Sequence, residues 1–181
     1  DEIGLKKFGS RPCMRALKIS KAHMTNKEFF LATLKEEAPK FRVAIEALPE
    51  GEHAYKVHDR AREIGNLAAQ LALQWKCISG IVLTGAPTFN PHEIVWDNRA
   101  SVLAKFEAGM TQLEADLASI SDSEWETGGC GWGAEHIDTK YHMSWMFLFD
   151  AIHHRGQVAT YLRAMGSKVP SIYGPSADSQ S

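Results

Sequence analysis

The sequence is short of the features that mark several classes of protein. It has three cysteines in 181 residues, far apart and with no CxxC pair. This argues against a disulfide framework or a cysteine-bound zinc site, and it favours free thiols in a reducing compartment, which we predict to be the cytoplasm. No apolar run approaches the roughly twenty residues of a membrane span. The formal net charge is −2, without the strongly basic face typical of nucleic-acid binders. We therefore expect neither a membrane partner nor a nucleic-acid partner.

What is present is the composition of an ordinary globular domain. Hydrophobic residues make up 44% of the chain and charged residues 23%, and the length suffices for one substantial core. Residues 1–23 differ, because they show neither a sustained helical period nor a signal-peptide block. We interpret them as a leader or an expression-derived extension, the alternative being a native extension that packs on the domain. The domain proper is expected over residues 24–181.

Apolar residues at helical spacing predict four helices. The expected segments run over about 26–48, from about 59 to 78, from 97 or 98 to about 117, and from about 140 to 165. Pro39 should kink or split the first helix, because proline has no amide hydrogen to donate. Ser79 and Gly80 should end the second helix, and Gly166 should stop the fourth. No segment is convincing as a strand.

Four amphipathic helices without strands predict an all-α fold, a four-helix bundle. The two middle connections are too long for tight hairpins. A crossover topology is therefore favoured over a simple up-down-up-down order. The second of these connections, residues 120–140, is rich in glycine and is expected to be a surface loop over one end of the domain.

The last predicted helix carries two polar residues on an apolar face. The residues that recur on this face at intervals of three and four are Met143, Phe147, Asp150, His154, Val158, Tyr161 and Met165. Asp150 and His154 lie one turn apart and can reach one point, whereas His153 is about 100° round the axis. Carboxylate and imidazole are both good ligands for first-row divalent metals. A third ligand would come from the second helix, with Gln70 and Glu63 as candidates.

A structural role explains the same polar residues equally well. Burying an aspartate costs free energy unless it is paired, so a metal-free hydrogen bond from His154 to Asp150 would give this spacing. Arg155 can extend its charged end to solvent, pair with an acid or bind an anionic substrate, and we favour structural pairing. Gly156 lowers helix stability and suggests the close approach of another helix. Together with His153 and Arg155 beside it, both expected to be exposed, this predicts a homodimer.

The stretch "HHRGQVATYLRAMGSKVPSIYGPSAD", residues 153–178, resembles the DinB/YfiT-like superfamily of metalloenzymes, the DinB family. The resemblance runs from about Met24 to Asp178 and includes "LPEGEHAYKVHDRAREIGNLAAQLA" before and within the second helix. It implies a four-helix bundle with crossover connections that is often dimeric. It also implies a metal site of three histidines, one on the second helix and two spaced i, i+4 on the fourth.

By position, these three ligands fall on Gln70, Asp150 and His154, so only one is the expected histidine. Glutamine is a neutral oxygen donor, and we expect the preference among zinc, nickel and manganese to move toward the ion that accepts oxygen ligands. The resemblance implies a metal-dependent enzyme acting on an unidentified small molecule, either a thiol-dependent S-transferase or a hydrolase. The alternative is a non-catalytic, stress-related bundle without metal that binds a small ligand or an interaction partner. Metal content distinguishes the two classes.

Overall fold

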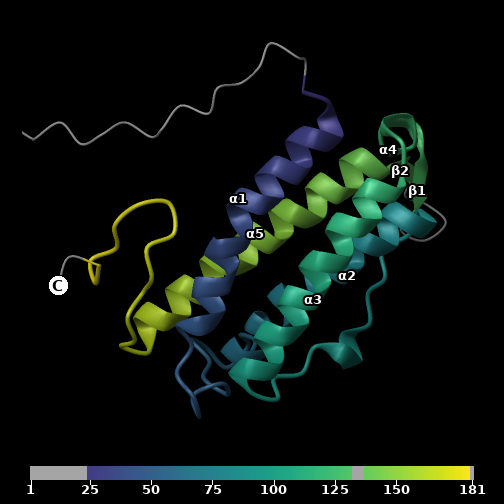
Figure 1. The fold of residues 1–181 in the computed structure, drawn as a ribbon. Coiled ribbons are helices and arrows are strands. Elements are labelled where there is room, and N and C mark those ends of the chain that lie inside the picture. The colour runs from purple at the N-terminus through teal and green to yellow at the C-terminus, as the bar shows by residue number, and fades with distance from the viewer. Residues whose placement is uncertain (1–23, 132–136, 180–181) are drawn as a thin grey trace, which may run out of the picture.

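The computed structural model describes residues 24–131 and 137–179, which form four long helices with a small cap at one end (Figure 1). The expected leader, residues 1–23, lies outside the described residues. The long helices are α1 (Asn26–Glu46), α2 (Ile64–Thr84), α3 (Arg99–Ser119) and α5 (Lys140–Ala164). The short elements are η1 (Pro91–Glu93), α4 (Asp122–Thr127), β1 (Gly129–Gly131) and β2 (Ile137–Thr139). The predicted all-α four-helix bundle is confirmed.

The helices are connected by crossovers, as the long loops predict. α2 packs between α3 and α5, and α1 packs against the same two helices from the other side, so α1 and α2 lie across the diagonal. Lys27 at the start of α1 donates to the carbonyl of Ile120 just after α3 (2.5 Å), and Lys140 at the start of α5 donates to Val82 O in α2 (2.8 Å). α1 and α5 therefore begin at the end of the bundle where α2 and α3 finish. α1 runs parallel to its neighbour α5, and α2 runs parallel to its neighbour α3.

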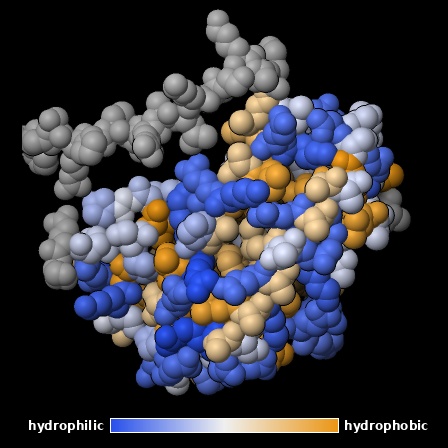
Figure 2. Space-filling view, viewed as in Figure 1, coloured by the Kyte–Doolittle hydropathy of each residue, from blue (hydrophilic) through white to orange (hydrophobic). Residues whose placement is uncertain are grey.

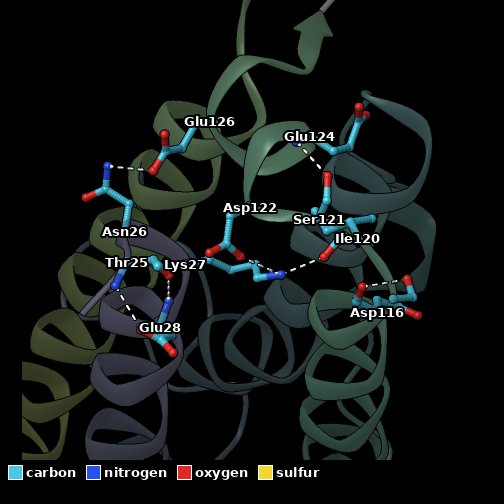
Figure 3. A network of polar contacts seen from close by, with 11 residues as sticks. Thr25, Asn26, Lys27, Glu28, Asp116, Ile120, Ser121, Asp122, Glu124 and Glu126 are labelled. Atoms are coloured by element: carbon cyan, nitrogen blue, oxygen red, sulfur yellow. Dashed lines mark hydrogen bonds and ion pairs between the residues drawn. The ribbon is translucent and has the colours of Figure 1, made fainter. Parts of the chain in front are cut away.

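The cap closes the end of the bundle at which α1 and α5 begin (Figure 3). Thr25 and Glu28 form a capping box, with Thr25 N donating to Glu28 Oε2 (2.8 Å) and Glu28 N donating to Thr25 Oγ1 (3.2 Å). Lys27 adds an ion pair to Asp122 in α4 (3.0 Å). The glycine-rich connection is thus not only a loop, since it contains α4 and the antiparallel pair β1–β2. Strands of three residues are too short to show a period in the sequence.

A split of α1 at Pro39 and an end of α2 at Gly80 were both possible from the sequence, and the structure has neither. α1 is not split at Pro39, which is exposed. The carbonyl of Lys35, which loses its amide donor, belongs to a residue that is exposed too, so water can take the place of that donor. α2 does not end at Gly80 but continues to Thr84, and Gly85 closes it at φ 70°. Gly80 is needed for close packing instead, because a Cβ there would lie 2.3 Å from the side-chain oxygen of Thr88.

α2 is the most deeply buried helix of the bundle, and Leu71, Trp75 and Ile78 are fully buried within it. Among the described residues it is the one helix long and apolar enough to cross a membrane. In its most apolar stretch, 78% of the residues are buried inside the bundle, as expected for a core helix. Figure 2 shows hydrophilic residues over most of the face seen in Figure 1, with apolar residues exposed between them.

Candidate functional site

The predicted polar pair of the last helix is formed, at the edge of the α2–α5 interface. Asp150 Oδ2 and His154 Nε2 are 3.4 Å apart. The pair is less buried than the apolar stripe predicts, since 49% of the Asp150 side chain and 16% of the His154 side chain remain exposed. The reason is that the buried face of α5 extends from the predicted stripe to the next line round the axis, so the stripe lies at its edge. That next line contains Ser144, Leu148, Ala151, Arg155 and Leu162.

The residue of α2 that meets this pair is Gln74. Its Nε2 donates to the carbonyl of Phe147 (3.0 Å) and to Asp150 Oδ2 (3.2 Å), and the side chain is almost fully buried. Gln74 lies one turn after Gln70 on the same edge of α2, so the sequence indicates the correct edge. Neither the spacing of the family ligands nor ligand chemistry would select Gln74 over Gln70 from the sequence. The contact of Gln74 with Asp150 depends on how far α2 is shifted along its axis relative to α5.

The two candidates for a third ligand are engaged elsewhere. Gln70 is buried, and its Oε1 accepts a hydrogen bond from Arg62 Nη1. Glu63 occupies the N-cap position of α2, and its carboxylate lies 4.0 Å from Lys56 Nζ. Among the described residues, neither candidate makes a hydrogen bond or an ion pair with Asp150 or His154.

A second amide orients the histidine from the other side. His154 Nδ1 is 2.8 Å from Gln157 Oε1, and Gln157 Nε2 is 3.0 Å from His153 Nε2. An amide oxygen can only accept, so with this orientation the Nδ1 of His154 carries the hydrogen. The Nε2 atom is then directed at the carboxylate of Asp150, where it can share a proton or a metal ion. A metal-ligating histidine has the same need for a partner on its other nitrogen.

One small cavity lies beside this cluster, and a larger, open one lies farther along α2. A cavity of about 10 Å³, room for a water molecule, is lined by Gln70, Gln74 and Cys77 under the connection after α2. The thiol of Cys77 donates to Thr88 O (3.0 Å), and burial raises its pKa to about 11. Cys77 is therefore a protonated structural thiol. A cavity of about 320 Å³ lies farther along, between Arg62, Asn66 and the connection.

The donor atoms at the cluster fit one kind of metal site and not another. In the described part of the chain, no three side chains of histidine, cysteine, aspartate or glutamate are close enough to hold a metal ion together. The closed site of three or four protein ligands that holds structural zinc is therefore not formed there. One carboxylate and one imidazole, half open to solvent, fit a divalent ion that keeps several of its waters.

The neighbouring Arg155 has the structural role that the sequence predicts. It is fully buried, so its expected exposure beside Gly156 is wrong, and its Nη1 lies 2.6 Å from Glu37 Oε2 in α1. Its Nη2 donates to the hydroxyl of Tyr173 in the C-terminal tail. Gly156 is exposed, and a Cβ built on it meets nothing within 4 Å. The close helix expected there is therefore not part of the described chain.

With fold and site in place, the chain can be assigned to a family. The DinB family model matches residues 24–180, and the chain belongs to this family. No protein among those with curated descriptions matches it.

Solved structures with the same fold include three from Bacillus species. A DinB-like protein of Bacillus cereus is 18% identical (TM-score 0.68, 81% of this chain and 97% of that one), and the DinB-like YjoA of Bacillus subtilis is 12% identical (0.63, 81% and 99%). YfiT of Bacillus subtilis is 16% identical (0.64, 90% and 95%). YfiT is described as "a probable metal-dependent hydrolase with an unusual four-helix bundle topology". At these identities the likeness is one of fold.

Proposed function

We propose that the protein is a metal-dependent enzyme with a reduced ligand set, acting as a hydrolase on a small molecule in the cytoplasm. One observation carries the proposal. His154 has one ring nitrogen held by Gln157 and the other turned toward Asp150, 3.4 Å away. This is the arrangement of a ligating histidine and its supporting partner. Membership of the DinB family and the description of YfiT add support.

The side chains of the cluster have separate roles in this proposal. Asp150 and His154 would hold the ion, which when bound would lower the pKa of a water molecule and supply a nucleophile at neutral pH. Gln74 fixes the carboxylate of Asp150 through its amide, and Gln157 fixes the imidazole ring. The half-open position of Asp150 leaves room for water and substrate beside the pair.

Thiol-dependent transfer requires a thiol from outside the described chain. Cys77 is buried with a raised pKa, and burial also raises the pKa of Cys130. Neither is suited to act as a thiolate near neutral pH. Hydrolysis needs only water, and we place it first for that reason.

A second candidate function is a bundle that binds a small ligand without metal. It is favoured by the absence, within the described residues, of a third acidic, histidine or cysteine side chain at the cluster. In that case Asp150 and His154 form a hydrogen-bonded pair, and the chain has no metal-activated water.

Calorimetric titration of chelator-treated protein with manganese, zinc and nickel separates these functions. We expect the wild type to bind manganese, His154→Ala to lose binding, and the matched variant His153→Ala to keep it. His153 is the next histidine on the same helix and contacts the same Gln157, but it is exposed and makes no contact with Asp150 in the described structure. It therefore serves as a control for the ligand role. Binding should weaken in acid, because both ligands must be deprotonated.

Two outcomes contradict the metal proposal. If the wild type binds none of the three ions at micromolar concentration, the metal-free function is the correct one. If His153→Ala loses binding while His154→Ala keeps it, the ligand has been assigned to the wrong histidine.

A further inference from the structure

The polar edge of α2 leads back from the Asp150–His154 pair to Arg62, which lies two residues before the helix and forms no ion pair with an acid in the described part of the chain. The guanidinium of Arg62 donates to the neutral amide of Gln70, one turn before Gln74. Among the described residues no carboxylate lies within ion-pairing distance of it. The nearest acid in sequence, Glu63, is placed toward Lys56. Arg62 therefore keeps its positive charge and several N–H donors for another group.

Arg62, which is exposed, borders an open cavity of about 320 Å³ on the surface of the molecule. Its other walls are Asn66, Phe89, Pro91 and Ile94. The side-chain amide of Asn66 makes no hydrogen bond to another described residue. The cavity thus has one cationic and one amide group at one side, and an aromatic ring with aliphatic carbons at the other.

Contacts from both α2 and α5 fix the position of this cavity relative to the Asp150–His154 pair. The hydroxyl of Tyr161 in α5 donates to the backbone carbonyl of Arg62 (3.1 Å), which ties the arginine to the helix that carries His154 about two turns earlier. On α2, Gln70 and Gln74 lead from the guanidinium of Arg62 to the carboxylate of Asp150. The arginine and the pair thus lie along the same edge of α2.

We propose that this cavity binds the carboxylate of a small apolar acid, with Arg62 as the anion-binding residue and Asn66 as its second donor. A planar guanidinium matches a carboxylate with two parallel hydrogen bonds. The apolar body of the acid packs on Phe89 and Ile94. The assignment of this acid as the substrate rests on the function proposed above, whereas its binding does not, because no metal ligand takes part.

The test is an NMR titration of the protein with benzoate, acetate and benzyl alcohol. Acetate keeps the charge without the ring, and benzyl alcohol keeps the ring without the charge. We expect benzoate to shift the Asn66 side-chain amide and the Ile94 resonances in a saturable way, and each truncated probe to bind about tenfold more weakly. Arg62→Gln should weaken benzoate binding by about tenfold or more, as loss of a charge-assisted hydrogen bond does.

Three variants keep the result interpretable. Arg60→Gln removes an exposed arginine two residues away and should leave benzoate affinity unchanged. Asn66→Ala should weaken binding, and it tests the cavity if Arg62→Gln does not fold. Asp150→Asn should abolish metal binding but not benzoate binding, so failure of one proposal is visible apart from failure of the other. Absence of benzoate shifts, or equal losses in Arg62→Gln and Arg60→Gln, would overturn the proposal.

Discussion

A buried charge pair joins α1 to α5 through Glu37 and Arg155. Burial alone would raise the pKa of Glu37, but hydrogen bonds from Lys40, Arg155 and Tyr173 outweigh it and hold the pKa below the ordinary value of 4.5. Arg155 also lies over the ring of Phe41, 4.5 Å from its centroid. Because the aromatic rings and the acid surround the guanidinium, loss of the Glu37 charge would leave Arg155 buried without an acidic partner among the described residues.

We predict that Glu37→Gln lowers the free energy of unfolding by about 3 kcal/mol at neutral pH. A lowered native pKa means that the carboxylate stabilises the fold above about 4.5, the ordinary value, and that this contribution is lost as the pH falls through the native pKa. The variant should therefore lose less stability in acid than the wild type. Urea unfolding at a series of pH values measures both effects. Glu36→Gln, whose side chain is 79% exposed, should behave like the wild type.

At this scale the sequence predicts contacts within one helix better than contacts between helices. The spacing of Asp150 and His154 alone places them together, because helix geometry fixes which side chains are neighbours. The pairing of Arg155 with an acid is also confirmed, but the identity of that acid, Glu37, depends on how α1 packs against α5. The contact of Gln74 with Asp150 has the same origin, and the family pattern of ligands pointed to Gln70 instead.

Among the elements, α2 contributes the centre of the core, because α3 and α5 pack on either side of it. Leu71 is fully buried there, whereas Leu83, near the C-terminal end of the same helix, is 52% exposed. We predict that Leu71→Ala costs about 2–5 kcal/mol of unfolding free energy, through lost burial and the cavity left behind. Thermal or urea unfolding measures the cost, with Leu83→Ala as the matched change. Equal effects of the two substitutions would mean that the packing of α2 is misplaced.

Helix ends were predictable where a capping side chain or a left-handed glycine sets them. Asn98 is the N-cap of α3, with its side chain accepting from Ser101 N (2.8 Å), and Gly166 follows α5 at φ 76°. Gly80 is also a glycine, but it does not end a helix. It makes room for the segment after α2 that packs against the helix near Thr88. A glycine required for close packing and a glycine required for a cap look alike in a single sequence.

For the whole molecule, we predict a homodimer formed through the exposed face of α5. Met146 and Phe149 are 53% and 56% exposed on this helix, and Phe29 of α1 is 54% exposed beside Trp145. Gly156 on the same helix has no side chain, so another chain could pack closely against α5 there. Light scattering should give twice the chain mass at micromolar concentration.

Phe149→Lys should shift this dimer to the monomer, because a charge would have to be buried at its interface. Leu83→Lys places the same charge at an exposed apolar residue on α2 and should leave the mass unchanged. A wild-type monomer at these concentrations, or a dimer that survives Phe149→Lys, contradicts the predicted interface.

The crossover order of the helices also bears on how the chain reaches its native state. Contacts that close the cap end join residues far apart in sequence, with Lys27 and Ile120 separated by 93 positions and Val82 and Lys140 by 58. The entropy of closing such long loops is lost before the contacts form, and bundles with many distant contacts fold more slowly than those built from hairpins. Because α2 and α3 are consecutive long helices that pack side by side, we expect their contact to form at a lower cost in loop entropy than the contacts of α1 with α3 and α5.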